Sequence, residues 1–245
     1  STAMNLRNLC AALLLCAPLA ATAESQPEPV PLVKVDDFAV TNLHLAIFNA
    51  QEGNKPTDAN QQITLLNELR EHVSIPINMK LSPWFSSVGH MVKALERAGA
   101  AGVSLFNRFY QPDINIDALR LQHSLHPSVS ADALLAMRWV AILHGRVECS
   151  LGATGGVHTH EDAIKLLLAG TDVVHLCFAL LQKGPAHLTR LIDATGEWME
   201  QQGFEQLEDF RGRRSQLSVL DPSDYERLNY IRVLGSYKGA EGVWR

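Results

Sequence analysis

The sequence predicts an α/β protein in which parallel strands alternate with helices, as in part of a (β/α)₈ barrel. From residue 72 onward, apolar strands alternate with amphipathic helices, the pattern of parallel strands covered by helices. An open doubly wound sheet fits this alternation equally well. The barrel is favoured by the paired glycines Gly155-Gly156, which follow the third strand, one unit before the last. Barrels often hold phosphate in the loops after their final two strands.

The strands and helices are predicted from apolar periodicity and capping residues. The predicted strands cover residues 73–81, 102–107, 147–152 and 173–178. The predicted helices cover residues 57–70, 88–98, 131–143, 161–169 and 185–202. Ser86 or Ser87 begins the second helix, Gly99 ends it, and Thr159 caps the fourth. Residues 72–203 therefore form a half barrel, and residues 204–245 are predicted to be a helical extension packed beneath it.

The segment before residue 72 has a different character. Residues 1–23 combine a basic start, an apolar run and Ala21-Thr22-Ala23, which together resemble a secretory signal peptide and predict export to the periplasm. Residues 24–71 are predicted to be a linker, marked by Pro27, Pro29 and Pro31, followed by the helix at 57–70. Residues 38–50 fit a helix and a strand equally well.

Composition limits the classes of function. The chain has 245 residues, of which 47% are hydrophobic and 19% charged, so a globular domain is expected. The net charge of -5 is spread without acidic or basic blocks, which argues against a nucleic-acid partner. No apolar run reaches the ~18 residues of a membrane span. His158 and His160 lack a third ligand at useful spacing, so no metal site is predicted. The expected partner is a small-molecule substrate.

Two polar residues end apolar strands, where barrel sites assemble. Lys80 lies near the end of the first strand and Asn107 ends the second. Lys80 either faces the barrel mouth or extends its ammonium group to the rim. The segment Gly155-Gly156 either brings backbone amides close to a phosphate or forms a tight turn.

Several blocks together resemble the FMN-dependent dihydroorotate dehydrogenase family. They are residues 74–83 (Ser-Ile-Pro-Ile-Asn-Met-Lys-Leu-Ser-Pro), 98–107, 153–157 and 161–163. Residues 106–113 and 138–143 resemble a bacterial dihydroorotate dehydrogenase-like branch of that family. The resemblance covers about residues 68–237. It implies a cytoplasmic enzyme of pyrimidine biosynthesis that transfers hydride from a dihydropyrimidine-like substrate to FMN.

The resemblance also implies roles for individual residues. Lys80 would contact the flavin ring, and Asn107 the flavin or the substrate. The FMN phosphate would be held by the backbone amides of Gly155, Gly156 and Val157. After the last strand, Cys177 and Phe178 stand where the family completes its phosphate cup with small residues.

Lys80 corresponds to the fifth strand of a family barrel, so the resemblance predicts strands five to eight alone. The catalytic base of the family comes from the first half, and the ~70 preceding residues cannot hold four βα units, so the catalytic residue is unknown. One alternative is a non-catalytic truncated or fused barrel that retains FMN or phosphate binding. Residues 4–69 resemble the exported N-terminus of a parvulin-type peptidylprolyl isomerase, so an exported folding helper is another. Unpaired sheet edges predict a homo-oligomer or a partner that supplies the missing half.

Overall fold

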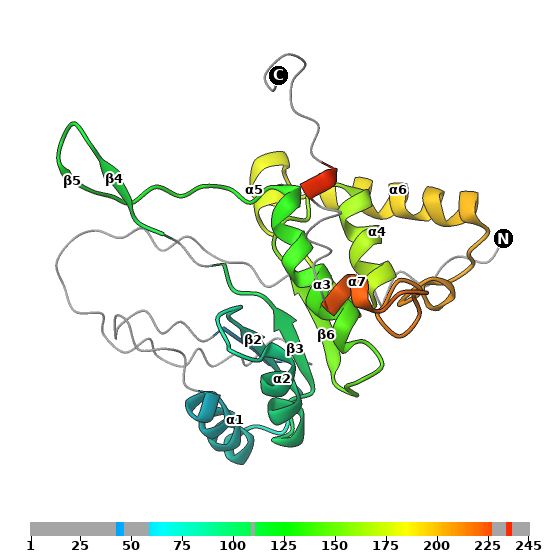
Figure 1. Cartoon of the computed structure of the whole chain (residues 1–245), viewed down its shortest axis with the longest axis horizontal. Helices are drawn as coiled ribbons and strands as arrows, with labels where there is room; N and C mark the ends of the chain where they lie inside the picture. The colour runs from blue at the N-terminus through cyan, green and yellow to red at the C-terminus, as the bar shows by residue number, and fades with distance from the viewer. Residues whose placement is uncertain (1–42, 47–58, 109–110, 227–233, 237–245) are drawn as a thin grey trace.

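The structure, a computed structural model, describes residues 43–46, 59–108, 111–226 and 234–236 (Figure 1). The signal-like segment 1–23, the prolines of the linker, most of the parvulin-like stretch and the last residues of the chain lie outside this part.

The centre of the fold is a five-stranded, entirely parallel sheet. Its strands, in the order β1-β2-β3-β6-β7, are β1 (Leu43–Ala46), β2 (Ile77–Leu81), β3 (Gly102–Leu105), β6 (Ser150–Thr154) and β7 (Val173–His175). The predicted α/β class with parallel strands is confirmed. After residue 72 the sheet contains the four predicted strands, and β1, from the segment that fitted a helix and a strand equally well, adds a fifth by pairing with β2 in the register Leu43 to Ile77. A four-residue strand is too short for its periodicity to distinguish it from a helix.

Helices alternate with these strands. They are α1 (Ala59–His72), α2 (Val88–Arg97), α3 (Ala133–Leu143), α4 (His160–Ala169), α5 (Phe178–Lys183), α6 (Ala186–Gln202) and the short α7 (Ser223–Glu226). Ser87 caps α2 by accepting a hydrogen bond from the His90 backbone, as predicted. Gly99 follows the last turn with a φ of 94°, a conformation that favours glycine. Neither these helices nor any other in the described ranges is long and apolar enough to cross a membrane.

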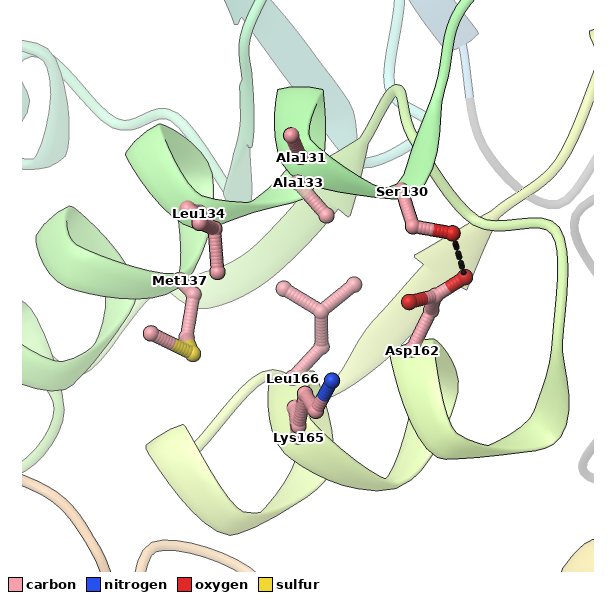
Figure 2. Close-up of a pocket in the computed structure, with 8 residues that line it drawn as sticks. All are labelled: Ser130, Ala131, Ala133, Leu134, Met137, Asp162, Lys165 and Leu166. Carbon is pink, nitrogen blue, oxygen red and sulfur yellow. Dashed lines mark hydrogen bonds between the residues drawn. The ribbon is translucent and has the colours of Figure 1, made fainter. Parts of the chain in front are cut away.

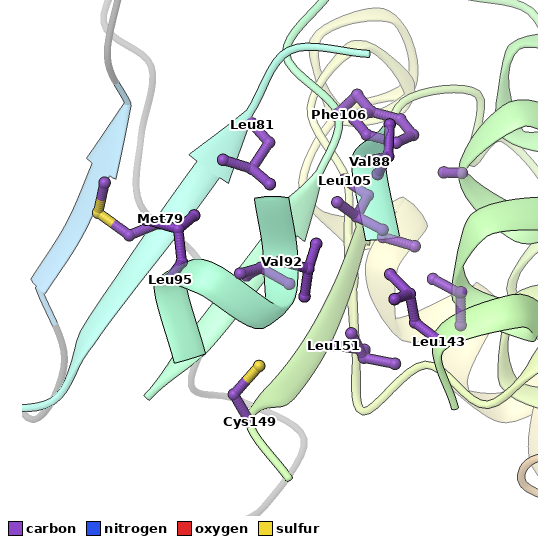
Figure 3. Close-up of a cluster of buried hydrophobic side chains, with 14 of the residues drawn as sticks. Met79, Leu81, Val88, Val92, Leu95, Leu105, Phe106, Leu143, Cys149 and Leu151 are labelled. Atoms are coloured by element: carbon purple, nitrogen blue, oxygen red, sulfur yellow. The ribbon is translucent and has the colours of Figure 1, made fainter. Parts of the chain in front are cut away.

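The main core lies between the sheet and the helices α2 and α3 (Figure 3). Met79 and Leu81 of β2 and Leu105 of β3 are fully buried there. Leu66 of α1 belongs to the same core, so α1 and the half barrel share one interior. Burial is the main cause that raises the pKa of the Cys149 thiol to about 12. This thiol therefore stays protonated and packs as a small apolar group.

An arm leaves the body between β3 and α3. It is the antiparallel hairpin of β4 (Asp113–Asn115) and β5 (Arg120–Gln122), which projects away from the sheet in Figure 1. Ile114 and Leu121 are register partners on one face of the hairpin, and both are exposed. This arm interrupts the alternation of strands and helices between β3 and α3.

The segment after α6 contains less helix than predicted. It consists mainly of turns, with a 3-10 segment at Leu207–Asp209 and the four-residue α7. Gly203 and Gly212 adopt positive φ, which breaks helical continuation. The segment docks through its backbone: the N–H groups of Gly212 and Arg214 donate to Leu167 and Leu168 at the end of α4. The tail thus supplies a donor to the Leu168 carbonyl and a second donor to the Leu167 carbonyl, which also accepts from the Gly170 N–H.

A second small core anchors this tail. The rings of Trp198, Phe204 and Phe210 lie with centroids 5.1 to 5.7 Å apart, and Phe210 is fully buried. Aromatic clusters of this kind contribute through both buried area and ring geometry. Phe204 and Phe210 of the tail therefore pack against Trp198 of α6 from a segment of turns.

Asp172 joins the tail to the sheet, and its removal should destabilise the fold. One carboxylate oxygen accepts from the backbone N–H of Leu151 at 2.7 Å, and the other pairs with Arg211 at 2.5 Å. Because Asp172→Ala leaves a buried N–H without its acceptor, we expect the free energy of unfolding to fall by about 1–2 kcal/mol. Arg211→Ala removes only a part-exposed ion pair and should cost less than about 1 kcal/mol. Urea denaturation checks both, and equal losses would contradict the assignment to the Leu151 N–H.

Candidate functional site

The predicted site residues lie along one edge of the sheet. Lys80 is the fourth residue of β2, and Asn107 follows β3 by two residues. Gly155 comes directly after β6, and Cys177 follows β7 by two residues. Because all these strands are parallel, their carboxyl ends meet at the same edge. Asn107 is fixed there by its backbone N–H, which donates to the Leu81 carbonyl at 2.6 Å.

A row of polar side chains crosses the sheet face opposite to the core. The Ser104 hydroxyl of β3 donates to Asn78 Oδ1 of β2 at 3.0 Å. It also lies 3.3 Å from Nε2 of His175 on β7. Lys80 is the register partner of Ser104 and therefore points to this same face. This face, defined by Asn78, Lys80, Ser104 and His175, is here called the polar face.

Gly152 makes the polar face continuous. It lies on β6 between Ser104 and His175, and a Cβ there would come within 2.8 Å of His175 Nε2 and 3.0 Å of Ser104 Oγ. Because Gly152 has no side chain, the His175 ring can extend across β6 to Ser104. The residues Asn78, Ser104 and His175 were not predicted to be functional. The sequence signal that could have found them is the presence of a polar residue within each of three otherwise apolar strands.

The two glycines after β6 have different surroundings. Gly155 has a φ of 94°, and an added Cβ would meet no atom within 4 Å. Gly156 has a φ of 75°, and a Cβ there would lie 2.3 Å from the Ala133 nitrogen and 2.8 Å from the Val129 carbonyl oxygen. Gly155 is thus open on one side, whereas Gly156 packs tightly against the start of α3.

The backbone beyond these glycines is arranged around Asp162. This buried carboxylate accepts from the backbone N–H groups of His158 and Thr159 at 3.0 and 3.1 Å. It also accepts from the Ser130 hydroxyl at 2.7 Å. Within residues 111–226, by contrast, the backbone N–H groups of Gly156 and Val157, which are both buried residues, donate to no protein acceptor. Buried donors without an acceptor are rare and suit an anion.

The helix that follows this loop is capped as predicted. Thr159 accepts from the Asp162 N–H, which with the reverse bond forms a capping box at the start of α4. Burial alone would raise the pKa of Asp162, but hydrogen bonds from Ser130 and from the His158 and Thr159 amides outweigh it. The pKa of this carboxyl group is therefore held below its ordinary value, and the group stays ionised.

Cys177 and Phe178 lie at the start of α5, two and three residues after β7. Cys177 is exposed. It directly precedes α5, in which Ala179 is the buried residue. Phe178 begins α5, and its ring lies 5.5 Å from the guanidinium carbon of Arg108. Phe178 therefore packs toward the segment after β3.

A hollow of about 140 Å³ lies between α3 and α4 (Figure 2). It is bounded by Met137, Leu134 and Leu166, with the hydrogen-bonded pair of Ser130 and Asp162 at one end. Cofactor sites usually have volumes of roughly 300–1,000 Å³. The hollow is too small for a flavin, and neither Lys80 nor Gly155 lines it. Elsewhere in the described ranges, no three His, Cys, Asp or Glu residues group as metal ligands.

Known proteins resemble this chain at the level of an oxidoreductase family. The catalytic subunit of dihydroorotate dehydrogenase B (NAD(+)) from Oceanobacillus iheyensis is 27% identical over 183 residues, covering 73% of this chain and 60% of that relative. The same subunit from Thermoplasma acidophilum is 27% identical over 172 residues, covering 69% and 56%. That from Halalkalibacterium halodurans is 27% identical over 188 residues, covering 73% and 60%. No family model matches the chain.

The similarity agrees with the resemblance inferred from the sequence blocks. The chain is similar to dihydroorotate dehydrogenases and spans about 60% of the length of these relatives.

The two loop glycines should respond differently to the same substitution. Gly155→Ala places a side chain in open space and introduces only the strain of a positive φ, roughly 1–2 kcal/mol. Gly156→Ala adds a collision with the backbone at Ala133 and Val129. We expect Gly156→Ala to lower the free energy of unfolding by clearly more than Gly155→Ala in urea denaturation. Equal losses would contradict the packing described for this loop.

Asp162 should make stability depend on pH. Its pKa in the folded protein lies below the ordinary value of 3.8, so its stabilising contribution is present above that pH and is lost as the pH falls through the folded pKa. The destabilisation caused by Asp162→Asn should therefore be largest near neutral pH and shrink between about pH 5 and pH 2. Unfolding free energies measured across this range provide the check. Asp193→Asn, on the exposed side of α6, is the control and should show no such trend.

Proposed function

We propose that the chain is an FMN-dependent oxidoreductase resembling dihydroorotate dehydrogenase, with the cofactor at the carboxyl edge of the parallel sheet. One observation carries the proposal: the glycine loop, with its free buried amides, and Lys80 of the polar face belong to the same sheet edge. A flavin mononucleotide needs such a pair of features, one for its phosphate and one for its ring. The similarity to dihydroorotate dehydrogenase B supports the choice of this cofactor.

The residues present fit the phosphate end of FMN. The amides of Gly156 and Val157 are donors in need of an acceptor, and Gly155 leaves the approach open. Since α4 begins four residues after Gly156, the positive end of its dipole also favours an anion near this loop.

The polar face fits the ring end. Lys80 supplies a positive charge that favours electron-rich ring atoms, and it is held at a fixed register opposite Ser104. Asn107 offers two donors and an acceptor at the next strand. When bound, the flavin supplies a two-electron acceptor for hydride. The residues of this chain bind and orient it, and lower the energy of its charged reduced form.

The catalytic base is not assigned to any residue. The segments that supply it in the family resembled have no counterpart in the sequence blocks. This supports a second candidate function, FMN binding without turnover. Oxidation of dihydroorotate by the purified chain would eliminate that candidate.

Titration with FMN tests the proposal. We expect the purified chain to bind FMN and quench its fluorescence, with a yellow absorbance spectrum. Lys80→Ala should weaken binding of oxidised FMN by a few-fold and lower the flavin reduction potential, because the reduced ring loses a neighbouring positive charge.

Lys93→Ala removes the same charge from the exposed side of α2 and should change neither quantity. A colourless protein that leaves FMN fluorescence unchanged would exclude the cofactor. An unchanged reduction potential in Lys80→Ala would exclude the role given to Lys80.

A further inference from the structure

We propose that Lys183 determines the preference of the cofactor site for a phosphorylated flavin over an unphosphorylated one. This inference rests on the proposed function, because it assigns a residue to the phosphate end of the same site. Lys183 is the last residue of α5, and its Nζ lies 3.3 Å from the carbonyl oxygen of His158. His158 directly follows Val157, so the ammonium group is held beside the loop that carries the free amides.

A second bond fixes this arrangement. The same carbonyl oxygen of His158 lies 2.9 Å from Nε2 of His187, a buried residue in the first turn of α6. Both ends of the segment between α5 and α6 therefore contact the glycine loop through one atom, the carbonyl oxygen of His158. This attachment limits how far Lys183 can move away from the loop.

The charges around the loop make a nearby cation favourable for binding an anion. The ionised carboxylate of Asp162 accepts from the His158 and Thr159 amides of this loop and opposes any anion placed beside it. Among the described residues, Lys183 forms no ion pair with a carboxylate. Its bond to a neutral carbonyl leaves further N–H donors of its ammonium group for an anion.

The two ends of α5 present different side chains. At its start, the Phe178 ring lies 5.5 Å from the guanidinium carbon of Arg108. At its end, Lys183 reaches the carbonyl oxygen of His158, so this short helix brings a cation to the glycine loop through its last residue.

Comparison of FMN with riboflavin tests this role, because the two differ only by the phosphate. Dissociation constants are measured by fluorescence quenching for the wild-type chain, Lys183→Gln, Lys183→Arg and the control Lys93→Ala. Lys183→Gln keeps a donor toward His158 but removes the charge. We expect it to weaken FMN binding about three- to tenfold and riboflavin binding less than about twofold. Lys183→Arg and Lys93→Ala should keep the wild-type preference.

Salt gives an independent readout. Raising the ionic strength should weaken FMN binding to the wild type more than to Lys183→Gln, because an ammonium–phosphate interaction is screened. Equal losses for both flavins would indicate a structural role and overturn the proposal, as would an unchanged FMN affinity in Lys183→Gln. A wild-type chain that binds neither flavin would instead overturn the proposed function, and this inference with it.

Discussion

Parallel pairing in a fixed register is the constraint on which the rest of this structure depends. Because each strand runs in the same direction, every βα loop leaves at the same edge. For this reason the same edge holds residues that are far apart in the sequence, namely Lys80, Asn107, Gly155 and Cys177. The crossover helices that parallel strands require also cover one face of the sheet with the core. The opposite face is then left for polar side chains.

The polar face shows how closely packing and chemistry are linked here. Ser104 is fully buried, so its hydroxyl needs partners, and it finds them in Asn78 and His175. The contact with His175 exists because Gly152 has no side chain. A single glycine in a strand thus decides whether three strands share one hydrogen-bonded network. Lys80 stands beside this network in the register, which orients its charge.

The glycine loop combines saturated and free amides. Asp162 occupies the amides of His158 and Thr159, and Ser130 ties the same carboxylate to the start of α3. The amides of Gly156 and Val157 remain available, and Gly156 is held in place by its close approach to Ala133. An ionised carboxylate beside an anion site is unfavourable by itself. Lys183, at the end of α5, brings a positive charge to the His158 carbonyl of this loop.

The sequence by itself determined the features that depend on near neighbours. The alternation of strands and helices, the caps at Ser87 and Thr159 and the position of the glycine loop all follow from local periodicity and side-chain chemistry. Only the tertiary structure decided the features that depend on distant partners. Strand β1 is defined by its pairing with residues 34 positions away, and the polar face joins side chains from three strands. The tail was predicted to be a helical extension packed beneath the half barrel. Its glycines and its docking onto the ends of α3 and α4 instead stabilise turns, and no local pattern contains those contacts.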